Sequence, residues 1–282
     1  MRAQRRRLLV LDAYASEGRT ALRDAGGTPA GRLYARLLEK LSPGSEVDIA
    51  YPADSDDDVP SEADLSNYAG AVWTGSSLSI LEADHPPVRR QIDLARRLFD
   101  CGVPSFGSCW AAQLAVVAAG GACEANPKGR EFGISRKIAL SPAGRAHPLY
   151  RDKPDRFDAF TSHADHVVTL PSRSSVLASN DFSPVQALVV ERAKGSFWAV
   201  QYHPEYDLRE VASLCRLRGS ELVAQGVFAD AREVRDTIEG FEALHRDPSR
   251  ADLADELDVS PDLLDEESRT LEVRNWLSEQ VG

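Results

Sequence analysis

Short apolar runs alternate with amphipathic stretches along the first half of the chain. Four runs rich in Val, Ile and aromatic residues are each bounded by Gly, Pro or Asp, at positions 8–14, 46–51, 70–75 and 103–108. Such runs are typical of buried strands. Thr28 followed by Pro29 predicts a helix start, with the helix running to about Leu41, and apolar spacing predicts a second helix over 87–100. This alternation predicts an α/β fold with a mostly parallel central sheet flanked by helices.

The pattern changes after about Gly133 to strands with shorter links. We expect strands at 134–140, 157–162, 175–180, 185–191 and 197–203, then a helix over 206–225. Three helices are predicted near 229–245, 249–257 and 261–279. The last carries Leu263 and Trp276, enough apolar surface to dock on a core. We therefore divide the chain into a main domain, 1–226, and a helical C-terminal extension, 227–282, whose role as a packed appendage or a partner-binding element stays open.

Charge is concentrated in this extension. The 282 residues carry a formal net charge of −11, and the segment 227–282 holds 16 Asp and Glu against six Arg. No basic stripe of the kind that nucleic acid requires is visible. No apolar run approaches the ~20 residues that span a bilayer. Four cysteines without a Cys-x-x-Cys pair indicate reduced thiols, so we expect a cytoplasmic protein that binds neither nucleic acid nor membrane.

The segment 103–113, Val-Pro-Ser-Phe-Gly-Ser-Cys-Trp-Ala-Ala-Gln, has the pattern of a nucleophile elbow. A strand leads into Cys109 and small residues open a helix, with Gly107 and Ala111 leaving room for a sharp turn. The helix N-terminus favours a thiolate and offers amides to a developing oxyanion. A buried structural cysteine is the alternative, and it is our interpretation of Cys101, Cys123 and Cys215.

His203 is the candidate base for this thiolate. It ends an apolar strand, Pro204 stops that strand, and the turn brings Glu205 close to the imidazole. A nucleophile, a base and a residue that orients the base form the usual set for covalent catalysis. Taken alone, His203 could equally be a core histidine.

Together, the motifs Gly-Ser-Cys-Trp-Ala-Ala-Gln and Gln-Tyr-His-Pro-Glu resemble the class I (triad) glutamine amidotransferases, above all the glutaminase domain of GMP synthase. Three further segments follow in the family's order: 68–77 resembles the strand and loop of the oxyanion hole, 129–133 an Arg-Glu-Tyr-Gly stretch, and 161–167 a segment that lines the glutamine pocket. The resemblance covers about residues 8–225 and implies a flavodoxin-like catalytic domain over 1–226.

By this resemblance Cys109 is the nucleophile, His203 the acid/base and Glu205 the residue that orients His203. The resemblance also implies that backbone amides of Ser76, next to Gly75, and of Trp110 hold the oxyanion. It implies a glutamine cradle made of Gln113, Ser162, Ala164 and Asp165, and of His163, where much of the contact in such motifs comes from the backbone. No cofactor is implied. A metal site at His163, His166 and Asp165 is disfavoured, because no further ligand set is spaced around them.

Two departures from the family pattern bear on the pocket. The oxyanion loop reads Thr-Gly-Ser-Ser at 74–77 where Ser-Gly-Gly-Pro is common, so we expect Ser76 to adopt a backbone conformation that Gly reaches more easily. Trp110 is expected at the pocket edge, where it is compatible with a substituted leaving group.

Nothing in the chain resembles a synthase domain, and no phosphate-binding Gly-rich loop is present. The first functional hypothesis is therefore a stand-alone hydrolase. It would cleave an N-substituted γ-glutamyl amide, such as an amine or aniline adduct, or glutamine, through a γ-glutamyl thioester. The alternative is a glutaminase subunit that feeds ammonia to a separate synthase partner. A degenerate binding module is the third hypothesis, and the intact Cys109, His203 and Glu205 set argues against it.

Overall fold

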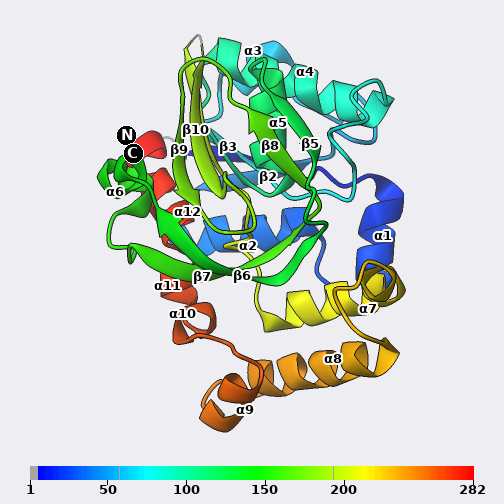
Figure 1. The fold of residues 1–282 in the computed structure, drawn as a ribbon. Coiled ribbons are helices and arrows are strands. Elements are labelled where there is room, and N and C mark those ends of the chain that lie inside the picture. The colour runs from blue at the N-terminus through cyan, green and yellow to red at the C-terminus, as the bar shows by residue number, and fades with distance from the viewer. Residues whose placement is uncertain (1–5, 57, 193) are drawn as a thin grey trace.

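A mixed sheet runs through the protein in the computed structural model, which describes residues 6–56, 58–192 and 194–282. In these residues nine strands pair in the order β2-β1-β3-β4-β11-β10-β9-β6-β7 (Figure 1). The parallel half contains β2 (Glu46–Ala50), β1 (Arg7–Leu11), β3 (Gly70–Trp73), β4 (Ser105–Ser108) and β11 (Gly195–Val200). The antiparallel half contains β10 (Ala187–Arg192), β9 (Ser174–Ser179), β6 (Glu131–Leu140) and β7 (Arg156–His163).

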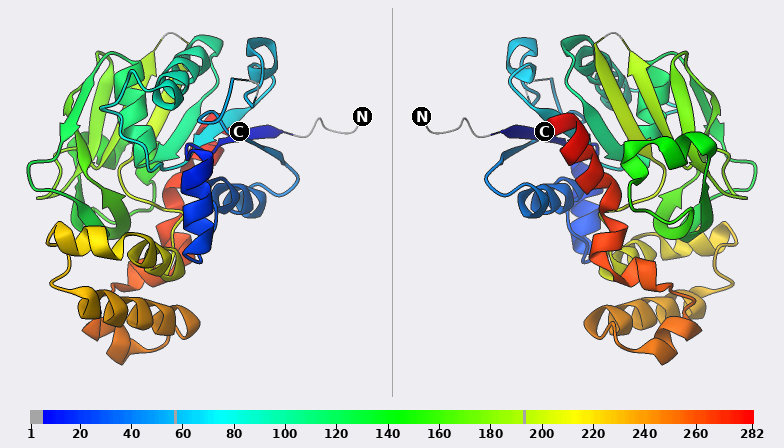
Figure 2. Two further views of the ribbon diagram at one scale, coloured as in Figure 1. Left: turned by 90° about the vertical axis from the view of Figure 1, so that its right-hand side faces the viewer. Right: turned by 90° about the vertical axis from the view of Figure 1, so that its left-hand side faces the viewer.

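Helices cover both faces of the parallel half. Successive side chains of a strand point to opposite faces, so Leu9 and Leu11 pack with α4 (Pro86–Cys101) and α5 (Trp110–Ala118), on the same side as α3 (Glu62–Leu65). Leu8 and Val10 pack with α2 (Ala30–Leu41) and α12 (Leu271–Trp276) on the other face (Figure 2). Each strand buried on both sides reads as a continuous apolar run, which is why the pattern was visible in the sequence.

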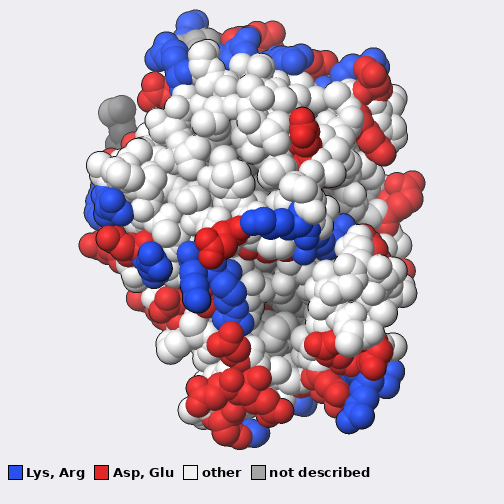
Figure 3. Space-filling model, in the orientation of Figure 1, with Lys and Arg blue, Asp and Glu red and all other residues white. Residues whose placement is uncertain are grey.

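Helix α7 (Leu208–Ala224) leads out of the sheet to α8 (Ala231–Arg246) and α9 (Ala251–Glu256), which form one end of the molecule (Figure 1). Acidic side chains gather on this end (Figure 3). The chain then returns through α10 (Pro261–Leu264), α11 (Glu266–Arg269), α12 and a final π-helical turn (Leu277–Val281). Trp276 is fully buried, and the centroid of its ring lies 5.9 Å from the centroid of the Phe106 ring. The last helices thus contribute to the core under the sheet, and the division of the chain at residue 226 stays a prediction.

The α/β class with a parallel core is confirmed, with several differences in detail. Helix α2 begins at Ala30 with Pro29 as its N-cap, and the Thr28 hydroxyl instead donates to Glu210, 2.7 Å away. The helix expected over 261–279 is divided into three short helices and the π-helical turn. The sequence did not predict α1 (Ser16–Asp24), α3, the two-stranded sheet of β5 (Ala122–Ala125) and β8 (Asp165–Thr169), or the short helices α6 (Pro142–Ala146) and η1 (Pro148–Tyr150). Across the part of the chain described, no helix is both long and apolar enough to cross a membrane.

Candidate active site

Cys109 occupies a sharp turn between β4 and α5. Its φ is +53°, and its N–H donates to the Val200 carbonyl at 2.8 Å. A non-glycine residue in this region costs about 1–3 kcal/mol, so the surroundings must enforce the turn. A Cβ at Gly107 would lie 2.4 Å from the Ala111 Cβ and 2.6 Å from the Trp73 carbonyl oxygen. Only glycine at 107 allows the strand and the helix to approach this closely.

His203 lies just beyond β11, almost fully buried. Its Nδ1 is 2.8 Å from Glu205 Oε1, which also accepts a hydrogen bond from Ser108 Oγ at 2.9 Å. The Tyr206 ring stacks on the imidazole with centroids 3.9 Å apart. A Cβ at Gly75 would lie 3.6 Å from His203 Nε2 and 3.7 Å from the Cys109 Cβ. The second imidazole nitrogen of His203, Nε2, and the side chain of Cys109 therefore both lie next to Gly75.

The charge on His203 distinguishes this thiol from its neighbours in the core. Burial alone would lower the pKa of His203, but the Glu205 carboxylate and a hydrogen bond with Cys109 outweigh burial and raise that pKa to about 10. At neutral pH a positive imidazolium therefore lies beside the Cys109 sulfur. In contrast, burial raises the pKa of Cys123 and of Cys215 to about 12, so those thiols stay protonated.

A cavity of 150 Å³ opens on the Cys109 sulfur. Gln113 Nε2 donates to the Asp165 carbonyl at 3.1 Å, and the Asp165 carboxylate accepts from Ser79 Oγ at 2.8 Å. Cys109 Sγ lies 3.5 Å from the Ser162 carbonyl oxygen. The cavity is lined by the expected oxyanion and cradle residues Ser76, Trp110, Gln113, Ser162, His163, Ala164 and Asp165. The structure brings these residues together; their roles stay predictions.

Two expectations about the pocket need correction. Trp110 lines the cavity, but its indole is 1% exposed, packs in the core, and donates from Nε1 to Gln91 Oε1 at 2.9 Å, so the ring is anchored in the core. Ser76 is also not strained as expected, since its φ angle is not positive. Its hydroxyl donates to the Ala13 carbonyl at 2.8 Å and accepts from Leu78 N–H at 3.1 Å. The hydrogen bond that the serine hydroxyl donates and the one that it accepts therefore hold the oxyanion loop without left-handed backbone strain.

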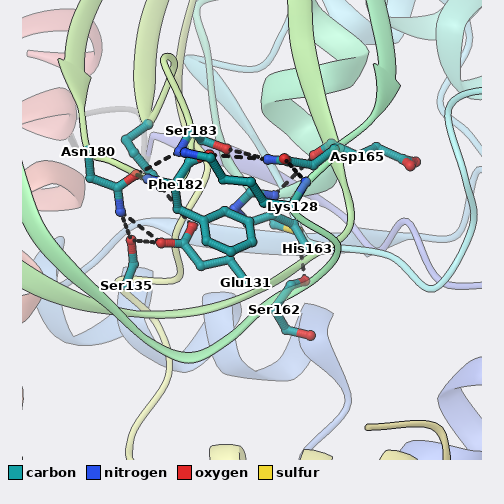
Figure 4. A network of polar contacts seen from close by, with 12 residues as sticks. Lys128, Glu131, Ser135, Ser162, His163, Asp165, Asn180, Phe182 and Ser183 are labelled. Carbon is teal, nitrogen blue, oxygen red and sulfur yellow. Dashed lines mark hydrogen bonds and ion pairs between the residues drawn. The ribbon is translucent and has the colours of Figure 1, made fainter. Parts of the chain in front are cut away.

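A buried polar network fixes the segment 162–165 (Figure 4). His163 Nε2 lies 2.8 Å from Glu131 Oε2, and Nδ1 lies 3.0 Å from the Asp165 carbonyl oxygen, so each ring nitrogen has a polar partner. Burial would raise the pKa of Glu131, but hydrogen bonds to the charged form, first that from His163, lower it. The same carboxylate accepts hydrogen bonds from Ser135, Asn180 and Gln186. His163 is therefore placed to hold the cradle segment in position.

Arg218 is not among the site residues that the sequence predicted. It lies on α7 and lines the cavity together with Arg130 and Cys109. Arg130 stood within a motif but had no assigned role, as did Glu131. Arg218 belongs to no motif, because α7 reaches the site only through the packing of helices. Among the described residues, no group of three or more His, Cys, Asp and Glu side chains could hold a metal ion.

Comparisons with known proteins agree with this geometry. A family model described as "Glutamine amidotransferase class-I" matches residues 48–215. A Pseudomonas protein named gamma-glutamyl-L-1-hydroxyisopropylamide hydrolase is 31% identical over 98% of this chain and 93% of its own length. The GMP synthase of Aromatoleum aromaticum is 33% identical over 64% of this chain but only 32% of its own length. The crystal structure of a glutamine amidotransferase from Thermotoga maritima superposes with a TM-score of 0.67 at 18% identity and covers 99% of each chain.

Proposed function

The chain belongs to the class I glutamine amidotransferase family, and from this premise we propose that it hydrolyses γ-glutamyl amides to glutamate and an amine. One observation carries the proposal. The similarity to the Pseudomonas hydrolase runs almost from end to end of both proteins, C-terminal helices included, whereas a GMP synthase matches over about a third of its own length. The relative that is matched over 93% of its own length is named as a hydrolase and not as a synthase.

In the proposed first half-reaction, the Cys109 thiolate attacks the δ-carbonyl carbon of the γ-glutamyl group. The developing oxyanion accepts hydrogen bonds from the backbone amides of Ser76 and Trp110. His203 donates its Nε2 proton to the departing nitrogen, and the C–N bond breaks to release the amine. Glu205 holds Nδ1 through its hydrogen bond, which keeps Nε2 directed at the reacting atoms. The product that remains on the protein is a γ-glutamyl thioester.

The second half-reaction returns the protein to its starting state. Neutral His203 accepts a proton from water as the water oxygen attacks the thioester carbonyl. The C–S bond breaks, glutamate leaves, and Cys109 again pairs as a thiolate with the imidazolium. No cofactor enters either step. The four cysteines are free thiols, which suits a reducing compartment, and we propose a cytoplasmic location on that ground.

A substrate panel tests the function. Purified protein alone should release glutamate from γ-glutamyl-L-1-hydroxyisopropylamide and from simple N-alkyl or N-aryl γ-glutamyl amides, with a higher kcat/KM than from L-glutamine. Released glutamate is measured with a coupled dehydrogenase, and Cys109→Ala protein is the blank. Weak turnover of every amide would contradict a stand-alone hydrolase. It would favour the alternative, a glutaminase subunit that depends on a separate synthase partner.

The pH profile tests the roles of His203 and Glu205. Above its pKa of about 10, His203 can no longer protonate the leaving nitrogen, so kcat/KM should fall on the alkaline side near that pH. In Glu205→Gln protein the opposing effect of burial dominates, and the alkaline limb should move down by at least about one pH unit. Glu191→Gln, at an exposed carboxylate of β10, is the matched control and should leave the limb in place. An unshifted limb in Glu205→Gln would remove Glu205 from the proposed mechanism.

A further inference from the structure

The Cys109 sulfur has space on two sides. The cavity of 150 Å³ lies on the side of Gln113 and Asp165, and a smaller recess of 10 Å³ lies on the side of His203. The walls of the recess include Tyr14, Tyr206 and Leu214. Four residues line both spaces: Ser76, Cys109, Ser162 and Arg218. Arg218 thus borders both of the spaces that open on the thiol.

The positive charge of Arg218 is only partly neutralised. Its Nη1 lies 3.3 Å from Glu221 Oε2, and the other oxygen of Glu221 lies 3.0 Å from Arg130 Nη2. One carboxylate therefore serves two guanidinium groups, and no other ion pair to either arginine is found among the described residues. The side chains of Arg218 and Arg130 are only 17% and 12% exposed, while Glu221 is 43% exposed. The two mostly buried guanidinium groups thus share the carboxylate of Glu221, which is still in contact with water.

Part of the Arg218 guanidinium also lacks a hydrogen-bond acceptor. Its Nε is buried and has no partner in the described part of the chain. Asp165 lines the same cavity but makes no ion pair with Arg218 there, and its carboxylate is suited to an ammonium group. An unpaired donor in a site of low water content is costly unless a ligand satisfies it. A planar guanidinium binds a carboxylate with two parallel hydrogen bonds, which suits the Nε and Nη atoms.

We propose that Arg218 binds a carboxylate of the substrate and selects for substrates that carry one at this position. The proposal rests on the γ-glutamyl amide hydrolase function proposed above. The carboxylate has two sources: the α-carboxylate of the γ-glutamyl group, or a carboxylate on the leaving amine. Arg218 is a specificity residue in this proposal, since it contacts a part of the substrate that does not react.

Three substrates separate the sources. γ-Glutamyl ethylamide carries only the α-carboxylate, γ-glutamylglycine carries one on each side, and the α-decarboxylated analogue of the ethylamide carries neither. Arg218→Gln should lower kcat/KM about 10- to 100-fold, the usual range for one charged hydrogen-bonding pair, only where the relevant carboxylate is present. Equal losses on both glutamyl substrates, with the analogue unchanged, identify the α-carboxylate. A loss confined to γ-glutamylglycine identifies the amine side.

Arg216→Gln is the matched control. Arg216 lies on the same helix but is paired with Glu242 away from the cavity, so all three rates should stay at the wild-type value. Arg218→Lys keeps the positive charge but not the planar guanidinium that can form two parallel hydrogen bonds. This variant should therefore recover part of the loss in kcat/KM. An equal loss on all three substrates in Arg218→Gln would overturn the proposal, because Arg218 would then act on the thiol or the fold. No loss on any substrate would overturn it as well.

A binding measurement makes the test independent of turnover. Cys109→Ala protein should bind γ-glutamyl ethylamide and γ-glutamylglycine, and adding Arg218→Gln should raise the Kd of at least one by the same 10- to 100-fold, measured by calorimetry. An unchanged Kd for both would overturn the inference. Wild-type protein that binds these amides in an Arg218-dependent way but cleaves none of them would contradict the proposed function and leave the inference standing.

Discussion

Replacing Cys109 with serine is expected to reduce kcat by about 10⁴-fold or more while the fold stays intact. A hydroxyl is far less acidic than a thiol, so the imidazolium of His203 can no longer pair with an anionic nucleophile. The side chain is 5% exposed, and serine is close in size to cysteine, so little packing changes. The measurement is amide hydrolysis by Cys109→Ser protein with a circular dichroism spectrum that matches the wild type.

A labelling experiment distinguishes Cys109 from the other thiols. A glutamine-mimicking alkylating agent should add one mass increment, located on Cys109 by peptide mapping. Cys123 and Cys215 should stay unmodified in the folded protein, because burial raises the pKa of each to about 12. Cys101, which is partly exposed, supplies the control: Cys101→Ser protein should keep both activity and label. Labelling at Cys101, or near-normal activity of Cys109→Ser, would exclude the proposed nucleophile.

The parallel half of the fold could be predicted from the sequence because its signals are local. Each of β1 and β3 is a short apolar run that Asp12 or Gly75 follows closely, and the intervening helices show apolar positions three and four residues apart. The antiparallel half depends on contacts between distant segments. The pairing of β6 with β9 joins Ala139 to Ser179, and nothing at either position specifies its partner. Likewise, β5 and β8 are too short and too polar to be distinguished from loops.

In the candidate site, too, some residues have a local sequence pattern and others are brought together only by tertiary packing. Cys109, His203 and Glu205 could be found because a strand-end position and its immediate neighbours carry the pattern. The Glu131 to His163 hydrogen bond and the approach of Arg218 to the thiol arise from tertiary packing, so they have no sequence signature. Trp110 shows the opposite error. Its place beside the nucleophile suggested a ring at the pocket edge, but the helix directs that ring to Gln91 in the core.

The second large effect is expected on stability, from Trp276→Ala. Trp276 is fully buried against Phe106, and a Cβ at Gly70 would lie only 2.8 Å from its ring. Removing a buried tryptophan side chain costs about 3–5 kcal/mol when the cavity cannot collapse. The free energy of unfolding, measured in urea, should fall by that amount. Leu170→Ala, at a side chain that is 42% exposed, is the control and should change it by less than about 0.5 kcal/mol.

The stability of Trp276→Ala also tests whether the C-terminal segment 227–282 is part of the core of the protein. Next to Trp276, the carboxylate of Glu272 is fully buried and ion-paired with Lys153 at 3.0 Å, and it accepts a hydrogen bond from Tyr202 at 2.6 Å. Removing residues 227–282 would leave Lys153 without its partner and expose the apolar face formed by Leu8 and Val10. We therefore expect the truncated chain 1–226 to fail to fold. A truncated protein that folds and hydrolyses amides, or a Trp276→Ala variant as stable as the control, would instead make the extension a dispensable appendage.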